Sequence, residues 1–163
     1  MRKWFCAGAV VAAAGLATSA GGVNGDIVFT NQSDDSIKVL SGGTLTTLVT
    51  FADPTTRLAG ITRAGNGKWY VANGPIPPTE TSASIFEIDD IFAAAPSVSV
   101  LAAGNPSQNP IHLRWDKARG VLMSINNPGR HPIDPALDGV LAYHLNGTTT
   151  TVWSEPDPVS RPF

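Results

Sequence analysis

Three asparagines stand at comparable points of the chain, each at the end of a short apolar run: Asn31, Asn73 and Asn126. If the three side chains face a shared channel, their carboxamides could hydrogen-bond a sugar-like ligand or give oxygen ligands to a hard cation such as Ca²⁺. Asparagine also commonly bonds the backbone of an adjacent turn, which is a purely structural use. The sequence leaves both interpretations open.

A second candidate is the loop segment that contains His131 and Asp134. A histidine with a carboxylate three residues on could act as a base with an orienting partner or as a metal ligand, although a solvated loop is the plainer alternative. A catalytic metal would need further carboxylates, and Asp53, Glu80 and Asp138 are those in neighbouring loops. No G-x-S-x-G elbow, H-E-x-x-H helix, P-loop or dinucleotide-binding motif is present. The sequence therefore favours binding over catalysis.

The elements that must position these residues are two hairpins with a similar plan. Leu58–Asn73 has alternating apolar runs on both sides of the turn Ala64–Gly67, and its Asn-Gly pair is typical of a tight antiparallel hairpin. Pro110–Asn126 repeats this plan around the turn Asp116–Gly120. The preceding segment, Asp26–Val49, reads as three short strands joined by turns. These patterns predict a chain of antiparallel strands.

Two markers indicate an internal repeat. The pairs Asp53-Pro54, Asn105-Pro106 and Asp157-Pro158 are spaced by 52 residues, and the three asparagines are spaced by 42 and 53. Repeats of about 40 to 50 residues with four strands each are typical of β-propeller blades. We therefore predict an all-β fold, an incomplete β-propeller of four-stranded antiparallel blades, with a single β-sandwich as the alternative.

The expected blades cover about residues 26–51, 58–102 and 110–153, and the first lacks its innermost strand. Such a chain could be a fragment of a longer protein, could associate with copies of itself to close the ring, or could form an open stack with exposed edges. The segment Asp157–Arg161 restarts the repeat, which favours a fragment. Between blades, flat aromatic side chains fill gaps well, and Trp69, Trp115 and Trp153 are expected there.

In a propeller, the loops that join the second strand to the third and the outermost strand to the next innermost one share one face. The two longest loops here, residues 74–83 and 127–138, are rich in proline, which lowers the entropy lost when a partner orders them. Binding residues concentrate in loops on a rigid frame. We predict a site for a small molecule or a protein on this face, with the candidates Asn31, Asn73, Asn126, Arg57, Asn105, Asn109, His131 and Asp134.

The N-terminus predicts export. Arg2 and Lys3 precede an apolar run of about 13 residues, which is shorter than the roughly 20 needed to span a bilayer, and small residues follow. We interpret residues 1–20 as a signal peptide and 21–25 as a flexible linker, with no stable membrane span. Cys6 is the only cysteine, so the exported chain would have none, which fits a secreted or periplasmic bacterial protein. Only 15% of residues are charged and no Lys/Arg cluster exists, which argues against a nucleic-acid partner.

The segment Arg57–Asn73, RLAGITRAGNGKWYVAN, resembles the blade core of NHL-type propellers, which the related gluconolactonase-like (SGL) propellers share. Thr62 and Arg63 depart from that pattern, since an Asp commonly precedes the turn there. The resemblance implies part of a six-bladed propeller. In the gluconolactonase-like family, Asn, Asp and Glu side chains around the channel hold a divalent metal, so the resemblance also raises metal-dependent hydrolysis of a lactone or ester.

Three functions remain after these considerations. The leading one is an exported propeller-type protein that binds a ligand or partner through its loop face and catalyses no reaction. It is expected to need no cofactor; the alternative is a bound divalent cation such as calcium. The second is a lactone or ester hydrolase of the gluconolactonase-like type. The third is a structural surface spacer. Fold alone does not decide among them.

Overall fold

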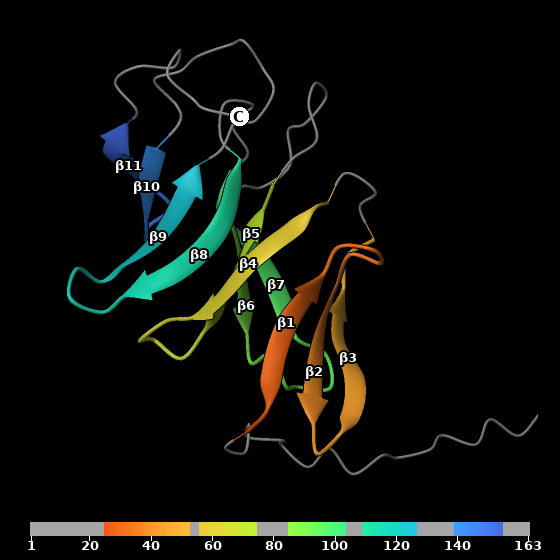
Figure 1. Cartoon of the computed structure of the whole chain (residues 1–163). Helices are drawn as coiled ribbons and strands as arrows, with labels where there is room; N and C mark the ends of the chain where they lie inside the picture. Colours follow the sequence, from red (N-terminus) through yellow and green to blue (C-terminus); the bar gives the residue numbers. More distant parts are fainter. Residues whose placement is uncertain (1–24, 53–55, 75–84, 104–108, 127–138, 155–163) are drawn as a thin grey trace, which may run out of the picture.

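The computed structural model describes residues 25–52, 56–74, 85–103, 109–126 and 139–154. These residues form eleven strands and no helix, in three antiparallel sheets whose strand order follows the chain (Figure 1). Sheet 1 contains β1 (Ile27–Asn31), β2 (Ser36–Ser41) and β3 (Thr44–Thr50). Sheet 2 contains β4 (Leu58–Arg63), β5 (Trp69–Asn73), β6 (Ile85–Asp89) and β7 (Ser97–Ala102). Sheet 3 contains β8 (Pro110–Asp116), β9 (Val121–Asn126), β10 (Gly139–His144) and β11 (Thr149–Ser154).

The hairpin turns show why the chain reverses where it does. In the β4–β5 turn the amide of Ala64 donates to the carbonyl of Lys68 at 2.9 Å, which encloses three residues that end at Gly67 with φ of 85°. The Asn66 side chain accepts the amide of Lys68 at 3.1 Å. The Gly67 amide also donates to the Ala64 carbonyl at 3.1 Å, so a β-turn is followed by a left-handed glycine, and the loop is one residue longer than the tightest Asn-Gly turn. The β10–β11 turn repeats it, with Gly147 at φ of 85°.

The sheets meet one another near β4. The Thr30 hydroxyl donates to the carbonyl of Ala59 at 2.5 Å, which joins β1 to β4, and the amide of Trp115 donates to Thr62 Oγ1 at 3.3 Å, which joins β8 to β4. At Gly60 any Cβ would overlap the backbone nitrogen of Leu113, so only glycine permits this approach of β4 and β8. Contacts between sheets run chiefly through β1, β4, β5 and β8, while the later strands of each sheet lie further out (Figure 1).

Two apolar clusters fill the spaces between the sheets, and sheet 2 contributes to both. Tyr70 and Ala72 belong to the cluster shared with sheet 3, whereas Val71 and Ile88 belong to the cluster shared with sheet 1. Alternate residues of a strand point to opposite faces, so β5 is buried on both sides. Consequently its sequence, WYVAN, is nearly continuous in apolar character.

These sheets confirm the expected all-β, incomplete propeller-type fold of antiparallel blades, the first of three strands and the next two of four. A single β-sandwich is wrong, because three sheets lie in series with β4 between β1 and β8. Trp69 and Trp115 pack against the two clusters as expected, but Trp153 is 51% exposed, and no other sheet of the described residues packs on sheet 3 beyond it. No helix in the described ranges is long and apolar enough to cross a membrane. The predicted signal peptide, residues 1–20, lies outside those ranges.

Candidate functional site

Asn73 and Asn126 make the same hydrogen bond in two successive sheets. Asn73 Oδ1 accepts the backbone amide of Arg57 at 2.6 Å, and Asn126 Oδ1 accepts that of Asn109 at 2.6 Å. In each sheet the donor stands immediately before the innermost strand, and both asparagine side chains are buried. Each bond ties the residue before the first strand of the sheet to the last residue of the second strand. We call the bond from Arg57 to Asn73, and that from Asn109 to Asn126, a clasp. These contacts support the structural interpretation of the two asparagines, and direct ligand binding by them stays a prediction.

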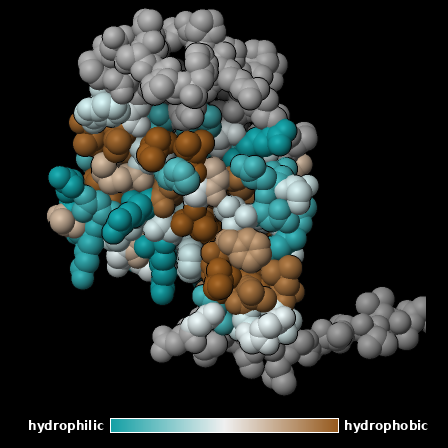
Figure 2. All heavy atoms as spheres, viewed as in Figure 1, coloured by the Kyte–Doolittle hydropathy of each residue, from teal (hydrophilic) through white to brown (hydrophobic). Residues whose placement is uncertain are grey.

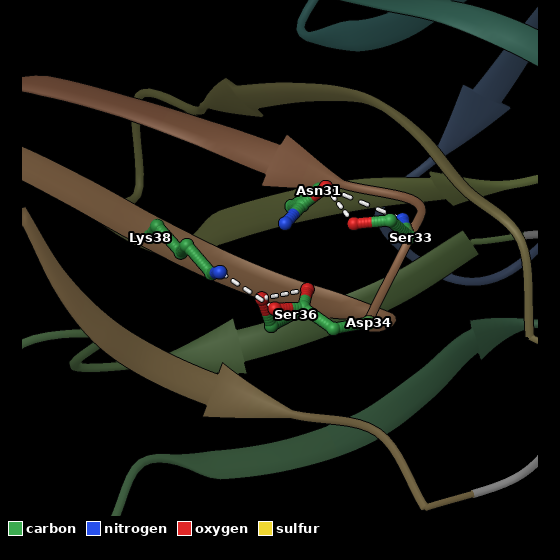
Figure 3. Close-up of polar contacts among 5 residues, drawn as sticks. All are labelled: Asn31, Ser33, Asp34, Ser36 and Lys38. Carbon is green, nitrogen blue, oxygen red and sulfur yellow. Dashed lines mark hydrogen bonds and ion pairs between the residues drawn. The ribbon is translucent and has the colours of Figure 1, made fainter.

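Asn31 holds the corresponding place in sheet 1, at the end of β1, but its contacts differ (Figure 3). Its Oδ1 accepts the Ser33 amide at 3.2 Å and the Ser33 hydroxyl at 2.9 Å. Beside it, Asp34 pairs with Lys38 at 2.6 Å and accepts the Ser36 hydroxyl at 2.5 Å. The hydrogen bond from Lys38, followed by that from Ser36, lowers the pKa of Asp34. This end of sheet 1 therefore carries a half-exposed polar group where sheets 2 and 3 carry a buried clasp.

The structure brings several of the sequence candidates to one end of the sheets. The Gly74 amide donates to the Arg57 carbonyl at 2.9 Å, and Gly74 lies against the Asn109 side chain of the next sheet. Arg57 and Asn109 thus stand next to the buried Asn73 clasp, with the Arg57 side chain exposed. Asn105, His131 and Asp134 lie outside the described residues. The structure therefore tests the position of some candidates and not of these three.

No metal centre is visible in the part of the chain that the structure describes: no three His, Cys, Asp or Glu side chains come together there. Oxygen atoms of Asn73 and Asn126 that could serve a hard cation already accept backbone amides. A calcium site on the loop face stays a prediction that concerns residues outside the described ranges as well.

A polar network that the sequence did not predict lies at the other end of sheet 2. Glu87 accepts hydrogen bonds from Lys68 at 2.7 Å and from the Tyr70 hydroxyl at 2.8 Å, and the Asn66 amide donates to that hydroxyl at 2.8 Å. Burial alone would raise the pKa of Glu87, but the bonds from Lys68 and Tyr70 outweigh it and lower the pKa. Tyr70 lies in β5, whereas Asn66 and Lys68 lie in the turn before it, and the approach of Glu87 requires the register between β5 and β6, so strand alternation alone does not predict this network.

A surface hollow lies beside the β8–β9 turn. It encloses about 460 Å³ and is lined by Arg114, Trp115, Asp116, Lys117, Ala118 and Met123. The Asp116 carboxylate is already paired with Arg119 at 2.6 Å, and hydrogen bonds from Arg119 lower its pKa. Arg114 and Lys117 are the exposed cations of this hollow. None of the sequence candidates lies in it.

Three antiparallel sheets in series, with loop ends gathered at one end, define a propeller-type all-β protein. No family model matches the chain, and no curated protein matches it in sequence. Two solved structures resemble it: a virginiamycin B lyase from Staphylococcus aureus and a streptogramin B lyase. Each is 16% identical with a TM-score of 0.41, over 84% and 85% of this chain.

The chain spans about half of those two proteins, 54% of each. At this identity and TM-score, the likeness says nothing about activity or site residues. The interpretation of the three sheets as blades depends on their strand order and mutual contacts.

Proposed function

We propose that the chain is an exported, propeller-type binding protein of the NHL and gluconolactonase-like kind, which recognises its ligand with the loop end of the sheets. The observation that carries this proposal is the repeated clasp of Asn73 on Arg57 and of Asn126 on Asn109. Each clasp fixes the point from which two loops depart, so proline-rich connections are attached to a rigid frame. Binding sites concentrate on loops held in this way.

Arg57 gives this end of the molecule its chemical preference. Its backbone amide is held by Asn73, while its side chain is exposed. A guanidinium offers several fixed donors that suit carboxylates and other anionic oxygen groups. The ligand class that fits best is therefore a small polar molecule that presents acidic oxygen groups.

The test uses the full chain and an array of immobilised sugars and sugar acids, followed by calorimetry with any compound that binds. A hydrogen bond to a charged group contributes about 1.5–3 kcal/mol, so Arg57→Ala should weaken binding by about tenfold or more. Arg63→Ala is the matched control, because Arg63 is an exposed arginine at the opposite end of β4. Equal loss in both variants, or no saturable binding at all, would contradict the proposal.

A calcium titration of the same protein addresses the hydrolase alternative. A ligand that binds only the folded state raises the unfolding temperature, and the rise grows with the logarithm of the free ligand concentration once that concentration exceeds Kd. The proposed binding function does not require calcium, so we expect no shift of several degrees. A large calcium-dependent shift together with hydrolysis of a lactone would favour an enzyme of the gluconolactonase-like type instead.

A further inference from the structure

The asparagines that end β5 and β9 give a common register for comparing the faces of the sheets. Counting back from Asn73, the first and third residues, Ala72 and Tyr70, pack toward sheet 3. The second and fourth, Val71 and Trp69, pack toward sheet 1. Each strand of this kind therefore has one face for the following sheet and one for the preceding sheet.

Sheet 1 follows the same register, and no other strand of the described ranges packs on its preceding side. Thr30 bonds Ala59 and Val28 packs in the cluster with sheet 2, so Ile27 and Phe29 point the other way. Ile27 pairs with Leu40, which pairs with Leu45, and all three side chains are exposed, Ile27 at 58%. Figure 2 shows apolar side chains gathered over this region, where β1 starts and β2 ends. We call this surface the leading face.

On sheet 3, the side that would meet a following sheet has no other described strand packed on it. Leu122 packs against sheet 2, so Met123 and Ile125 point away from it. Ile125 pairs with Val140, which pairs with Trp153, and Ile125 is 49% exposed. Part of the hollow beside the β8–β9 turn is lined by Met123 of this surface. We call it the trailing face.

We propose that a second copy of this chain docks head to tail, with the trailing face of one copy on the leading face of the other, and that two such contacts close a ring of two copies. The choice of a second copy as the partner follows from the contact that sheets 2 and 3 already make within the chain. Where sheet 2 meets sheet 3, Tyr70 and Ala72 face Leu122 in one cluster. In the docked pair, Met123 and Ile125 take the places of Tyr70 and Ala72 and face Ile27 of the second copy.

The size of the two faces favours a closed pair of copies. Sheet 1 has strands of five, six and seven residues. With about 3.3 Å per residue and about 4.8 Å between strands, one face covers on the order of 300 Å². One docking covers two faces, about half of the roughly 1,200 Å² that a small specific interface buries. Two such contacts between the same two copies reach that size. A head-to-tail contact that repeats from copy to copy gives either a closed ring or an open fibre.

The first experiment measures the mass of the full chain in solution over a wide range of concentration. We expect a species of twice the 17.0 kDa chain mass that dissociates on dilution. Ile27→Lys and Ile125→Lys should each weaken the association by at least tenfold. Val100→Lys is the control, because Val100 is also 58% exposed but lies on the outermost strand of sheet 2. A monomer at every concentration, growth beyond two copies, or equal effects of all three variants would overturn the proposal.

The second experiment tests the head-to-tail arrangement without charged substitutions. Ile27→Cys and Ile125→Cys are each placed in a Cys6→Ser background, which removes the only native cysteine. Because a head-to-tail contact brings residue 27 of one copy to residue 125 of the other, a short bifunctional thiol cross-linker should join a mixture of the two variants and neither variant alone. Cross-linking within either single variant would instead indicate face-to-face association and overturn the arrangement. Circular dichroism checks that each variant is folded.

Discussion

Replacing Asn73 with alanine tests whether the clasp at the loop end stabilises the fold. The substitution removes the acceptor of the Arg57 amide, a 2.6 Å bond in a site where Asn73 is 0% exposed. A buried donor left without its partner costs about 1–3 kcal/mol. With a urea m-value of about 2 kcal/mol per molar, a loss of about 2 kcal/mol lowers the midpoint of unfolding by roughly 1 M.

Urea unfolding followed by tryptophan fluorescence measures this midpoint, and an unchanged m-value shows that the comparison is valid. Asn31→Ala is the control, because Asn31 accepts only bonds from Ser33 among those described and is half-exposed. We expect its midpoint to move by less than about a third as much, since exposed bonds contribute little. Equal shifts in the two variants would refute the structural role of the clasp.

The remaining predictions concern the contact between sheets 2 and 3 and the polar network of sheet 2. Gly60→Ala forces a Cβ onto the backbone of Leu113 and should destabilise the protein by about 1–3 kcal/mol or more, measured by urea unfolding. Glu87→Gln should reduce stability at neutral pH. Because the folded pKa of Glu87 is lowered from 4.5, its contribution is complete above that pH and disappears as the pH falls through the folded pKa, so parent and variant converge in acid.

Matched controls separate these effects from general damage. Gly65→Ala places a Cβ at ordinary contact distance from the Trp115 ring and should cost much less than Gly60→Ala; equal costs would contradict the close approach of β4 and β8. For the network, a stability difference between Glu87→Gln and the parent that stays constant from neutral to acid pH would show that the charge of Glu87 is not involved.

The sequence predicts the hairpins well because their determinants are local. The Asn66-Gly67 pair sets the corner of the β4–β5 turn, and the regular spacing of the dipeptide markers predicts that the plan recurs. The pairing of strands joined by short turns follows almost directly, whereas β5–β6 and β9–β10 pair across the longer connections 74–84 and 127–138.

The candidate site was harder to interpret because its determinants are not local. Regular spacing identifies Asn73 and Asn126 as equivalent, yet it cannot show that their oxygens accept amides 16 and 17 residues away. Similarly, Trp153 is a large aromatic residue of the kind expected between blades, but whether its side chain is buried depends on whether another sheet packs beyond it. Spacing thus predicts equivalence between positions better than it predicts the partners of each side chain.

The position of sheet 2 between two others affects how the chain holds together as a unit. Since the larger contacts between the described strands of different sheets all involve β4 or β5, the outer sheets influence each other chiefly through this shared neighbour. Folding of sheet 1 is therefore coupled to folding of sheet 2, and folding of sheet 2 to that of sheet 3. Damage to the central element would uncouple both ends at once, whereas damage to either end would leave one complete pair of neighbours intact.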